Sequence, residues 1–279
     1  MIRTTGALHR RWLIIGAVMV MVVMVPHSQL MLQAANDHLD PTFGKDGKVR
    51  TDFLGGSSDF ASGLAIQFDG KIVAVGSVDG QFGLARYTTN GSLDPAFGSQ
   101  GKVTTTFNAF DIATAVALQR DGKIVVAGTA FNPDPTGPSD FAVARYNANG
   151  SLDATFGVGG KVTTDFTNAS AEAKAIAIQA DGKIVVVGQA ITDRDNQLAD
   201  MAIARYNRNG ALDLSFDGDG KATADLDELD EARAVAVSVD GKIVVAGLAR
   251  RDISLEETIG DFGLLRFQAS SEPAPPLPR

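Results

Sequence analysis

Short apolar runs, each followed by a polar turn signal, recur along the chain. Residues 113–119, 173–179 and 232–238 combine small and large apolar side chains, and their length and Val/Ile content predict strands rather than helices. An Asp-Gly pair follows each run and suits a two-residue type I′ hairpin, so we expect a second strand directly after it. That strand, Lys-Ile-Val, is apolar on successive positions, which predicts that both of its faces are covered.

Two further strands complete each predicted unit. An apolar phrase that ends in Arg and an aromatic residue, such as residues 141–146, predicts the third strand. An Asn-Gly pair then predicts a tight turn, and we expect the Ser-Leu-Asp-x-x-Phe phrase after it to form the fourth strand.

These phrases belong to an internal repeat. Leu-Asp-x-x-Phe occurs at residues 39–43, 93–97, 152–156 and 212–216, with spacings of 54, 59 and 60 residues. Gly-Lys-Val-x-Thr, Asp-Gly-Lys-Ile-Val and the Arg-aromatic phrase follow in the same order, although the last Gly-Lys-Val-x-Thr phrase is weakened by Ala222 and Ala224. A fixed period of this size predicts units that bury their faces against their neighbours.

The ends of the repeat predict how it closes. The last unit stops after Phe267 without a Leu-Asp strand, whereas residues 39–43 precede the first complete unit. We therefore predict an all-β fold, a β-propeller of about four four-stranded blades closed by the N-terminal strand. An open β-repeat array, or part of a larger ring formed by oligomerisation, is the alternative.

The repeated phrases resemble the bacterial delta-60 repeat, a unit of roughly 60 residues in a domain family of unknown function that is expected to form propellers. The resemblance covers about residues 38–268. It implies a bacterial protein that is secreted or held at the cell surface, and it implies no activity and no site residues.

The N-terminus predicts export. Arg3, Arg10 and Arg11 precede an apolar run at residues 12–25, which is shorter than a bilayer-spanning helix and suits a signal peptide. We expect a signal peptide at residues 1–35, the repeat domain at 36–268 and a Pro-rich disordered tail at 269–279. The expected location is secreted, periplasmic or at the cell surface, with membrane attachment only if the N-terminal segment is left uncleaved.

Charge and composition narrow the chemistry. The formal net charge of −8, which becomes −11 without residues 1–35, argues against a nucleic-acid partner. The chain has no cysteine, and its three histidines (His9, His27 and His38) all precede the repeats. Ser-His-Asp triads and ordinary histidine or thiolate metal sites are therefore not expected, and we predict no cofactor and no metal. An EF-hand-like start at Asp217 lacks the required ligand and glycine positions.

The repeated carboxylates read as structural. We expect the aspartates of the Asp-Gly pairs to form turns, and those of the Leu-Asp phrases to pair with the repeated arginines as a tie within each blade. The first set is Asp69, Asp121, Asp181 and Asp240. The second set is Asp40, Asp94, Asp153 and Asp213, and its expected partners come from the set Arg86, Arg145, Arg205 and Arg266.

A localised function should lie where the units differ. The loop after the Lys-Ile-Val strand is short at residues 77–81 and longer at 129–140, 189–200 and 248–261. Its charged candidates for binding are Asp134, Asp193, Arg194, Asp195, Arg250, Arg251 and Asp252. We expect a non-enzymatic binding or scaffold module with a protein or glycan partner; a carboxylate-based carbohydrate-active enzyme is the alternative.

Overall fold

The computed structural model describes residues 38–108, 110–134, 136–166, 170–193, 198–254 and 257–269. The predicted signal peptide and almost all of the predicted tail lie outside these residues. No helix long and apolar enough to cross a membrane occurs in the part of the chain described.

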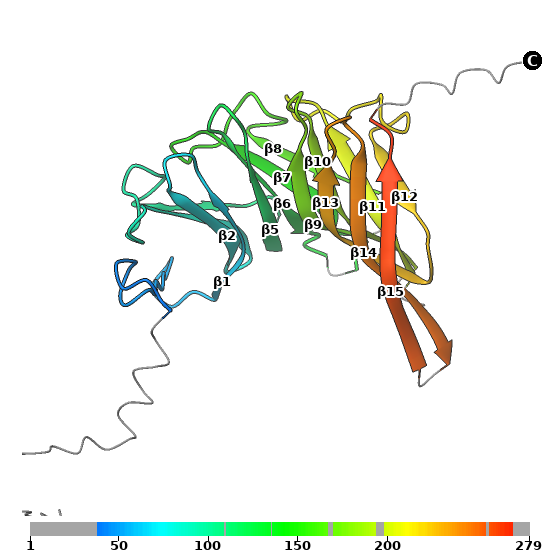
Figure 1. Cartoon of the computed structure of the whole chain (residues 1–279), viewed down its shortest axis with the longest axis horizontal. Coiled ribbons are helices and arrows are strands. Elements are labelled where there is room, and N and C mark those ends of the chain that lie inside the picture. Colours follow the sequence, from blue (N-terminus) through cyan, green and yellow to red (C-terminus); the bar gives the residue numbers. More distant parts are fainter. Residues whose placement is uncertain are drawn as a thin grey trace, which may run out of the picture.

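The fold is all-β and consists of three units of four strands and a fourth of three strands, which we call blades 1 to 4 (Figure 1). Blades 1 and 2 are separate four-stranded sheets, whereas one parallel bridge between Ala199 and Leu229 joins blades 3 and 4 into a seven-stranded sheet. Blade 1 contains β1 (Asp59–Ile66), β2 (Ile72–Val78), β3 (Gln81–Tyr87) and β4 (Lys102–Thr105). Blade 2 contains β5 (Phe110–Leu118), β6 (Ile124–Phe131), β7 (Asp140–Tyr146) and β8 (Lys161–Thr164). Blade 3 contains β9 (Ser170–Ile178), β10 (Ile184–Asp193), β11 (Leu198–Tyr206) and β12 (Lys221–Ala224), and blade 4 contains β13 (Leu229–Val237), β14 (Ile243–Ser254) and β15 (Glu257–Phe267).

The first three strands of each blade follow the sequence prediction, but the hairpin type differs. Gly122 has a φ of 83°, whereas Asp121 is not among the residues with positive φ. Gly122 N donates to Gln119 O, and Gln119 N donates to Lys123 O. The turn is therefore a three-residue hairpin in which a glycine in the left-handed region follows the β-turn, and the two-residue type I′ prediction was wrong.

The fourth strand also differs from the prediction. It is formed by the Gly-Lys-Val-x-Thr phrase, as in β4, which pairs antiparallel with β3. The Leu-Asp-x-x-Phe phrase makes only one bridge, between Tyr87 and Leu93, and then turns. Asp94 causes the turn, because its carboxylate accepts the backbone N–H of Ala96 and its carbonyl accepts that of Phe97.

The core lies between blades. Val73, Val75, Phe82 and Leu84 of blade 1 pack against residues of blade 2 in one cluster. Equivalent clusters join blades 2 and 3 and blades 3 and 4. The small residues of the inner strands allow the blades to approach closely: a Cβ on Gly63 of β1 would lie 3.1 Å from the Thr114 carbonyl oxygen of β5 in the next blade.

The blades form an open arc, with β1 near one end and β15 at the other (Figure 1). No sheet closes on itself among the described residues. Residues 39–53 lie against blade 1, where Gly44 N donates to Asn90 O, and they do not extend the sheet of β15. The structure thus contains propeller-like blades, but it does not contain the closed four-bladed ring that the sequence predicts.

Candidate functional site

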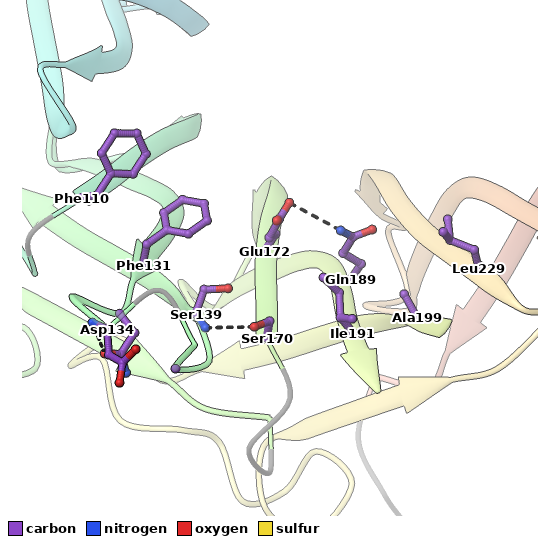
Figure 2. Close-up of a pocket in the computed structure, with 12 residues that line it drawn as sticks. Phe110, Phe131, Asp134, Ser139, Ser170, Glu172, Gln189, Ile191, Ala199 and Leu229 are labelled. Atoms are coloured by element: carbon purple, nitrogen blue, oxygen red, sulfur yellow. Dashed lines mark hydrogen bonds between the residues drawn. The ribbon is translucent and has the colours of Figure 1, made fainter. Parts of the chain in front are cut away.

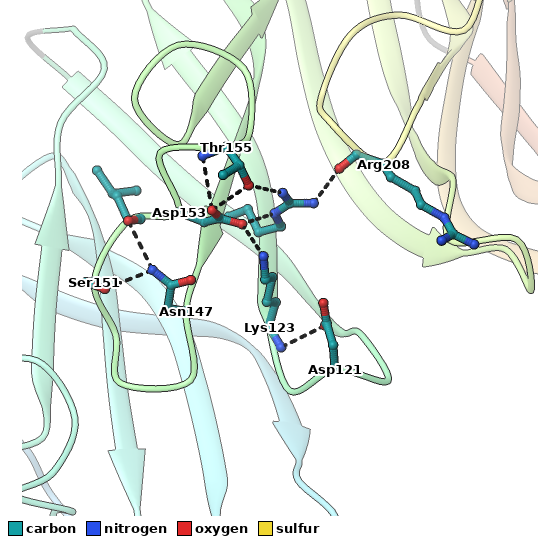
Figure 3. Close-up of polar contacts among 9 residues, drawn as sticks. Asp121, Lys123, Asn147, Ser151, Asp153, Thr155 and Arg208 are labelled. Atoms are coloured by element: carbon teal, nitrogen blue, oxygen red, sulfur yellow. Dashed lines mark hydrogen bonds and ion pairs between the residues drawn. The ribbon is translucent and has the colours of Figure 1, made fainter.

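Each complete blade is held by a buried polar tie at the end opposite the long loops. In blade 2, Arg145 Nε lies 2.8 Å and Lys123 Nζ 2.7 Å from Asp153 Oδ2 (Figure 3). Thr155 donates two further hydrogen bonds to Asp153 Oδ1. Burial would raise the pKa of Asp153, but its hydrogen bonds with Lys123 and Thr155 and the charge of Arg145 outweigh burial and lower it.

The tie also joins successive blades. The Arg145 guanidinium lies 4.7 Å from the centre of the Phe156 ring and donates to the backbone oxygen of Arg208 in the next repeat (Figure 3). Arg86 and Asp94, and Arg205 and Asp213, repeat this arrangement. The predicted Arg-Asp ties are confirmed in blades 1 to 3, and the predicted turn role of the Asp-Gly aspartates is confirmed by hydrogen bonds such as that from Lys123 N to Asp121.

The fourth predicted tie is absent from the described residues. No ion pair joins Arg266 and Asp40 there, and both side chains are exposed. The carboxylate of Asp40 accepts hydrogen bonds only within its own turn, from the N–H and hydroxyl of Thr42.

A pocket of about 540 Å³ lies on the opposite, long-loop side of blades 2 and 3 (Figure 2). One wall is aromatic: the rings of Phe110 and Phe131 meet edge to face, with centroids 5.5 Å apart. Ile191 and Leu229 supply apolar surface elsewhere. The volume is within the usual range for ligand pockets, and the apolar lining with a few polar groups is also typical of them.

Most of the polar groups of the pocket come from β9 and β10 of blade 3 and from Ser139, which precedes β7. Glu172 Oε2 accepts a long hydrogen bond of 3.5 Å from Gln189 (Figure 2). It also forms an ion pair of 2.8 Å with Lys174. Burial would lower the pKa of Lys174, but Glu172 and Glu231 outweigh burial and raise it. Ser139 and Ser170 are buried, and Ser139 N donates to Ser170 Oγ. These contacts fix the Glu172 carboxylate beside the apolar walls.

Of the charged loop residues that were predicted to bind a partner, only Asp134 lines the pocket among those described. Asp134 lines the pocket, but its carboxylate already accepts the N–H and hydroxyl of Thr136, which lower its pKa. Arg194 and Asp195 lie outside the described residues, and Asp193 lies at the end of β10.

The long segment at residues 248–261 was predicted to be a loop, and this prediction was wrong. Arg250, Arg251 and Asp252 lie in β14 and pair with residues of β15 in one extended hairpin. Arg250 lies opposite Gly260 and Arg251 opposite Ile259, so the antiparallel pairing continues through the segment that was predicted to be a loop.

The sequence reasoning missed a set of buried aspartates near the start of the inner strands. Asp111 is fully buried, and its Oδ2 accepts the N–H of Phe107 at 2.7 Å. Burial outweighs its hydrogen bonds and raises the pKa of Asp111. Asp230 of blade 4 is also fully buried and accepts the N–H of Leu226, whereas the equivalent Asp59 of blade 1 is partly buried and accepts the N–H of Phe53. A recurring Asp ahead of the first strand was the available signal, but Ala171 interrupts it in blade 3.

The described residues contain no group of three or more acidic or histidine side chains placed to hold a metal ion. They form instead an all-β array of blade-like repeats with a ligand-sized pocket on one side.

Comparisons agree with this class. Residues 67–97, 119–156 and 179–216 match the family model described as "Domain of unknown function (DUF5122) beta-propeller". The match supports a β-propeller-like repeat family whose function is unknown. No curated protein matches the chain.

Solved structures with partial similarity include a Dyadobacter fermentans protein of unknown function, with 15% identity and a TM-score of 0.43 over 76% of this chain and 66% of that one. Drosophila Plexin A in complex with Semaphorin 1b has 12% identity and a TM-score of 0.41 over 73% of this chain and 39% of that chain. Drosophila Semaphorin 1b has 10% identity and a TM-score of 0.28 over 73% of this chain and 65% of that chain. The chain spans less than two thirds of each of these proteins.

Proposed function

We propose that the protein is an exported, non-enzymatic binding or scaffold module, active in the cell envelope or outside the cell, and that its partner is a protein segment that inserts into the pocket of Figure 2. Export is supported by the charged and apolar pattern of residues 1–35 and by the resemblance to the delta-60 repeat.

The observation that carries the proposal is the contrast between the two sides of the blades. The polar ties of blades 1 to 3 repeat the same residues in the same contacts, whereas the pocket uses residues that change from unit to unit. Phe110, for example, is replaced at the equivalent position by Ser170 in blade 3 and by Leu229 in blade 4. A uniform scaffold with a variable loop side is the usual arrangement of binding repeat proteins.

The chemistry of the pocket favours a protein segment. Phe110 leaves 49% of its surface exposed beside Phe131, which offers an apolar anchor site. The Glu172 carboxylate lies in the same pocket and suits a basic group of the partner. We expect a segment with an apolar side chain next to Lys or Arg.

We further propose that the N-terminal segment completes blade 4 and so closes a propeller. A propeller formed by one chain would require the open arc of Figure 1 to tighten until its two ends meet, whereas a ring shared by two chains would join the ends of two arcs. In either ring the variable loops gather on one side and present a continuous surface.

A peptide-display experiment tests the binding proposal. The exported chain is immobilised and a phage-displayed random peptide library is selected on it. We expect enriched peptides that contain an apolar residue beside a basic one, and we expect Phe131→Ala to weaken their binding about tenfold or more. Glu172→Gln should weaken the same peptides by a smaller factor.

Asp181→Asn is the control, because it removes one negative charge of blade 3 in the hairpin turn at the opposite end and Asp181 does not line the pocket. It should leave peptide binding unchanged. Enrichment of no peptide, equal binding by the Phe131→Ala variant, or binding to an oligosaccharide array instead would refute the proposal.

A further inference from the structure

The two ends of the arc expose surfaces that are buried between blades elsewhere. On the third strands, Phe82, Phe141 and Met201 are 0%, 0% and 1% exposed, whereas Phe262 at the same position of β15 is 96% exposed. Leu264 is 65% exposed, while its equivalent Leu84 is fully buried. At the other end Leu64 and Ile66 of β1 are 66% and 65% exposed. The apolar faces at the two ends are thus the two halves of one further blade interface.

The N-terminal segment already has the position of an outer strand from a blade that precedes blade 1. The hydroxyl groups of Thr51 and Tyr87 lie 2.8 Å apart. Thr105 on the outer strand of blade 1 makes the same 2.8 Å contact with Tyr146 of blade 2. Lys102 likewise reaches back to the carbonyl oxygen of Phe53. What residues 48–51 lack, among the described residues, is a third strand to pair with.

The third strand of blade 4, β15, is instead without an outer strand along its free edge among the described residues. The outer strands pair with the third strands in a constant register, as in Leu84 opposite Val103 and Val143 opposite Val162. This register places Val49 opposite Leu264 in the missing pair. An unpaired edge strand with exposed apolar side chains is a template for strand addition.

The side chains on the two ends complete the missing contacts. Asp40 occupies the position of Asp153, and Arg266 and Lys242 occupy those of Arg145 and Lys123, so the fourth polar tie is divided between the ends of the chain. Aromatic side chains match as well. The rings of Phe82 and Phe107 pack at 5.0 Å, and Phe262 and Phe53 hold the equivalent positions. The charges are complementary and the apolar areas coincide.

We propose that residues 39–53 of a second copy of this chain fill the edge of β15, so that two chains form a closed eight-bladed ring by two such contacts. Residues 39–53 and β15 lie at opposite ends of the arc in Figure 1, and the three blade interfaces between them each contain a buried apolar cluster. A head-to-tail contact that closes after two copies gives a dimer with twofold symmetry, and eight blades lie within the usual range. This inference rests on the proposed completion of blade 4 by the N-terminal segment.

Engineered cysteines test it directly, because the chain has none of its own. The full chain is produced with Val49→Cys and Leu264→Cys together, and the exported protein is oxidised and run on a non-reducing gel. Directly opposed residues of paired strands are close enough for a disulfide. We expect most of the protein as a disulfide-linked dimer. Both positions are partly exposed, so the substitutions leave the core intact. Val49→Cys with Val158→Cys is the control, since Val158 is exposed on a distant turn, and it should remain monomeric on the gel.

The other outcomes separate the two proposals. A monomer with an internal disulfide would overturn the two-chain ring but would support the completion of blade 4 by the N-terminal segment of the same chain. Free thiols would overturn both the two-chain ring and the completion of blade 4. A ladder of larger species would overturn the two-chain ring.

Exchange of charges between chains gives a second test. Asp40→Arg and Arg266→Asp should each weaken dimer formation, because each variant places like charges in both contacts of its own dimer. A mixture of the two variants should restore the dimer, because a mixed pair has one native contact and one exchanged contact. If mixing does not restore the dimer, the proposed pairing of Asp40 with Arg266 is wrong.

Discussion

Blade 2 and blade 4 carry nearly the same sequence signals, yet their third strands have opposite environments. Arg145 is 5% exposed, with its charge compensated by Asp153, whereas Arg266 is exposed and has no ion pair among the described residues. Phe141 is fully buried and Phe262 is 96% exposed. The difference lies in the neighbour: blade 2 has its own outer strand and a following blade, and blade 4 has neither within the described part of the chain.

The comparison shows that each unit of this fold makes contacts that depend on its neighbours. The polar tie needs the Leu-Asp turn that leads into the outer strand, and the apolar face needs the next blade. Residues 39–53 carry the same turn and outer-strand phrases, and β1 carries an exposed apolar face, so the proposed contact between the ends would supply both.

The largest expected effect is on the buried tie. Arg145→Ala should lower the free energy of unfolding by about 3–5 kcal/mol, because it leaves the Asp153 carboxylate buried with only Lys123 as a charged partner. Urea unfolding followed by circular dichroism measures this loss. A loss below about 1 kcal/mol would mean that the tie contributes little.

The next largest effect is expected in the tie of blade 3, as a loss of folding stability at acid pH. Burial would raise the pKa of Asp213, but its hydrogen bonds with Lys183 and Ser215 and the charge of Arg205 outweigh burial and lower it to about 2. The unfolded pKa is about 3.9, so this stabilisation is complete above about pH 5 and is lost as the pH falls towards 2. Asp213→Asn should remove up to about 2 kcal/mol of this acid-dependent stability, measured as unfolding free energy against pH. Asp40→Asn is the matched control in the dissociated chain, and a similar change from it would contradict the contrast between the two aspartates.

A smaller effect is expected at the hydroxyl pair between blades 2 and 3. Thr164 Oγ1 and Tyr206 Oη lie 2.7 Å apart and are buried, whereas the next interface has Ala224 and Phe267 at these positions. Tyr206→Phe alone should cost about 1–2 kcal/mol, because it leaves the Thr164 hydroxyl without its partner. Tyr206→Phe with Thr164→Ala should cost less than the sum of the two single changes. Strict additivity in this double-mutant cycle would show that the pair is not coupled.

The smallest effect on unfolding is expected at the free end. In the dissociated chain at low concentration, Arg266→Ala should change the unfolding free energy by less than about 0.5 kcal/mol, since the side chain is exposed. The same variant should raise the concentration needed for dimer formation. A loss comparable to that of Arg145→Ala in the dissociated chain would show that Arg266 has a tie within its own chain.

The sequence predicted the repeat, the first three strands and the Arg-Asp ties, because each is marked by residues that recur in register. It misplaced the fourth strand because Leu93 and Asp94 look like a strand start, whereas the Asp94 carboxylate turns the chain. The pocket was only partly predictable. Asp134 was identified from loop length, but Phe110 and Glu172 lie at the start of the inner strands, where the residues are not the same in all units and the repeated phrases give no signal.

Ring closure was the least predictable feature. The repeat count predicts an outer strand at the N-terminal end of the repeats, but it does not predict whose blade that strand completes. That choice depends on the rotation between neighbouring blades, which arises from packing across the interfaces and leaves no mark in the spacing of the phrases.

The most direct test of the two-chain ring is the mass and shape of the exported chain in solution, by light scattering combined with small-angle X-ray scattering. We expect a particle of twice the chain mass with the scattering profile of a flat, closed ring. A compact particle of one chain mass would contradict the shared ring and assign the N-terminal strand to its own fourth blade.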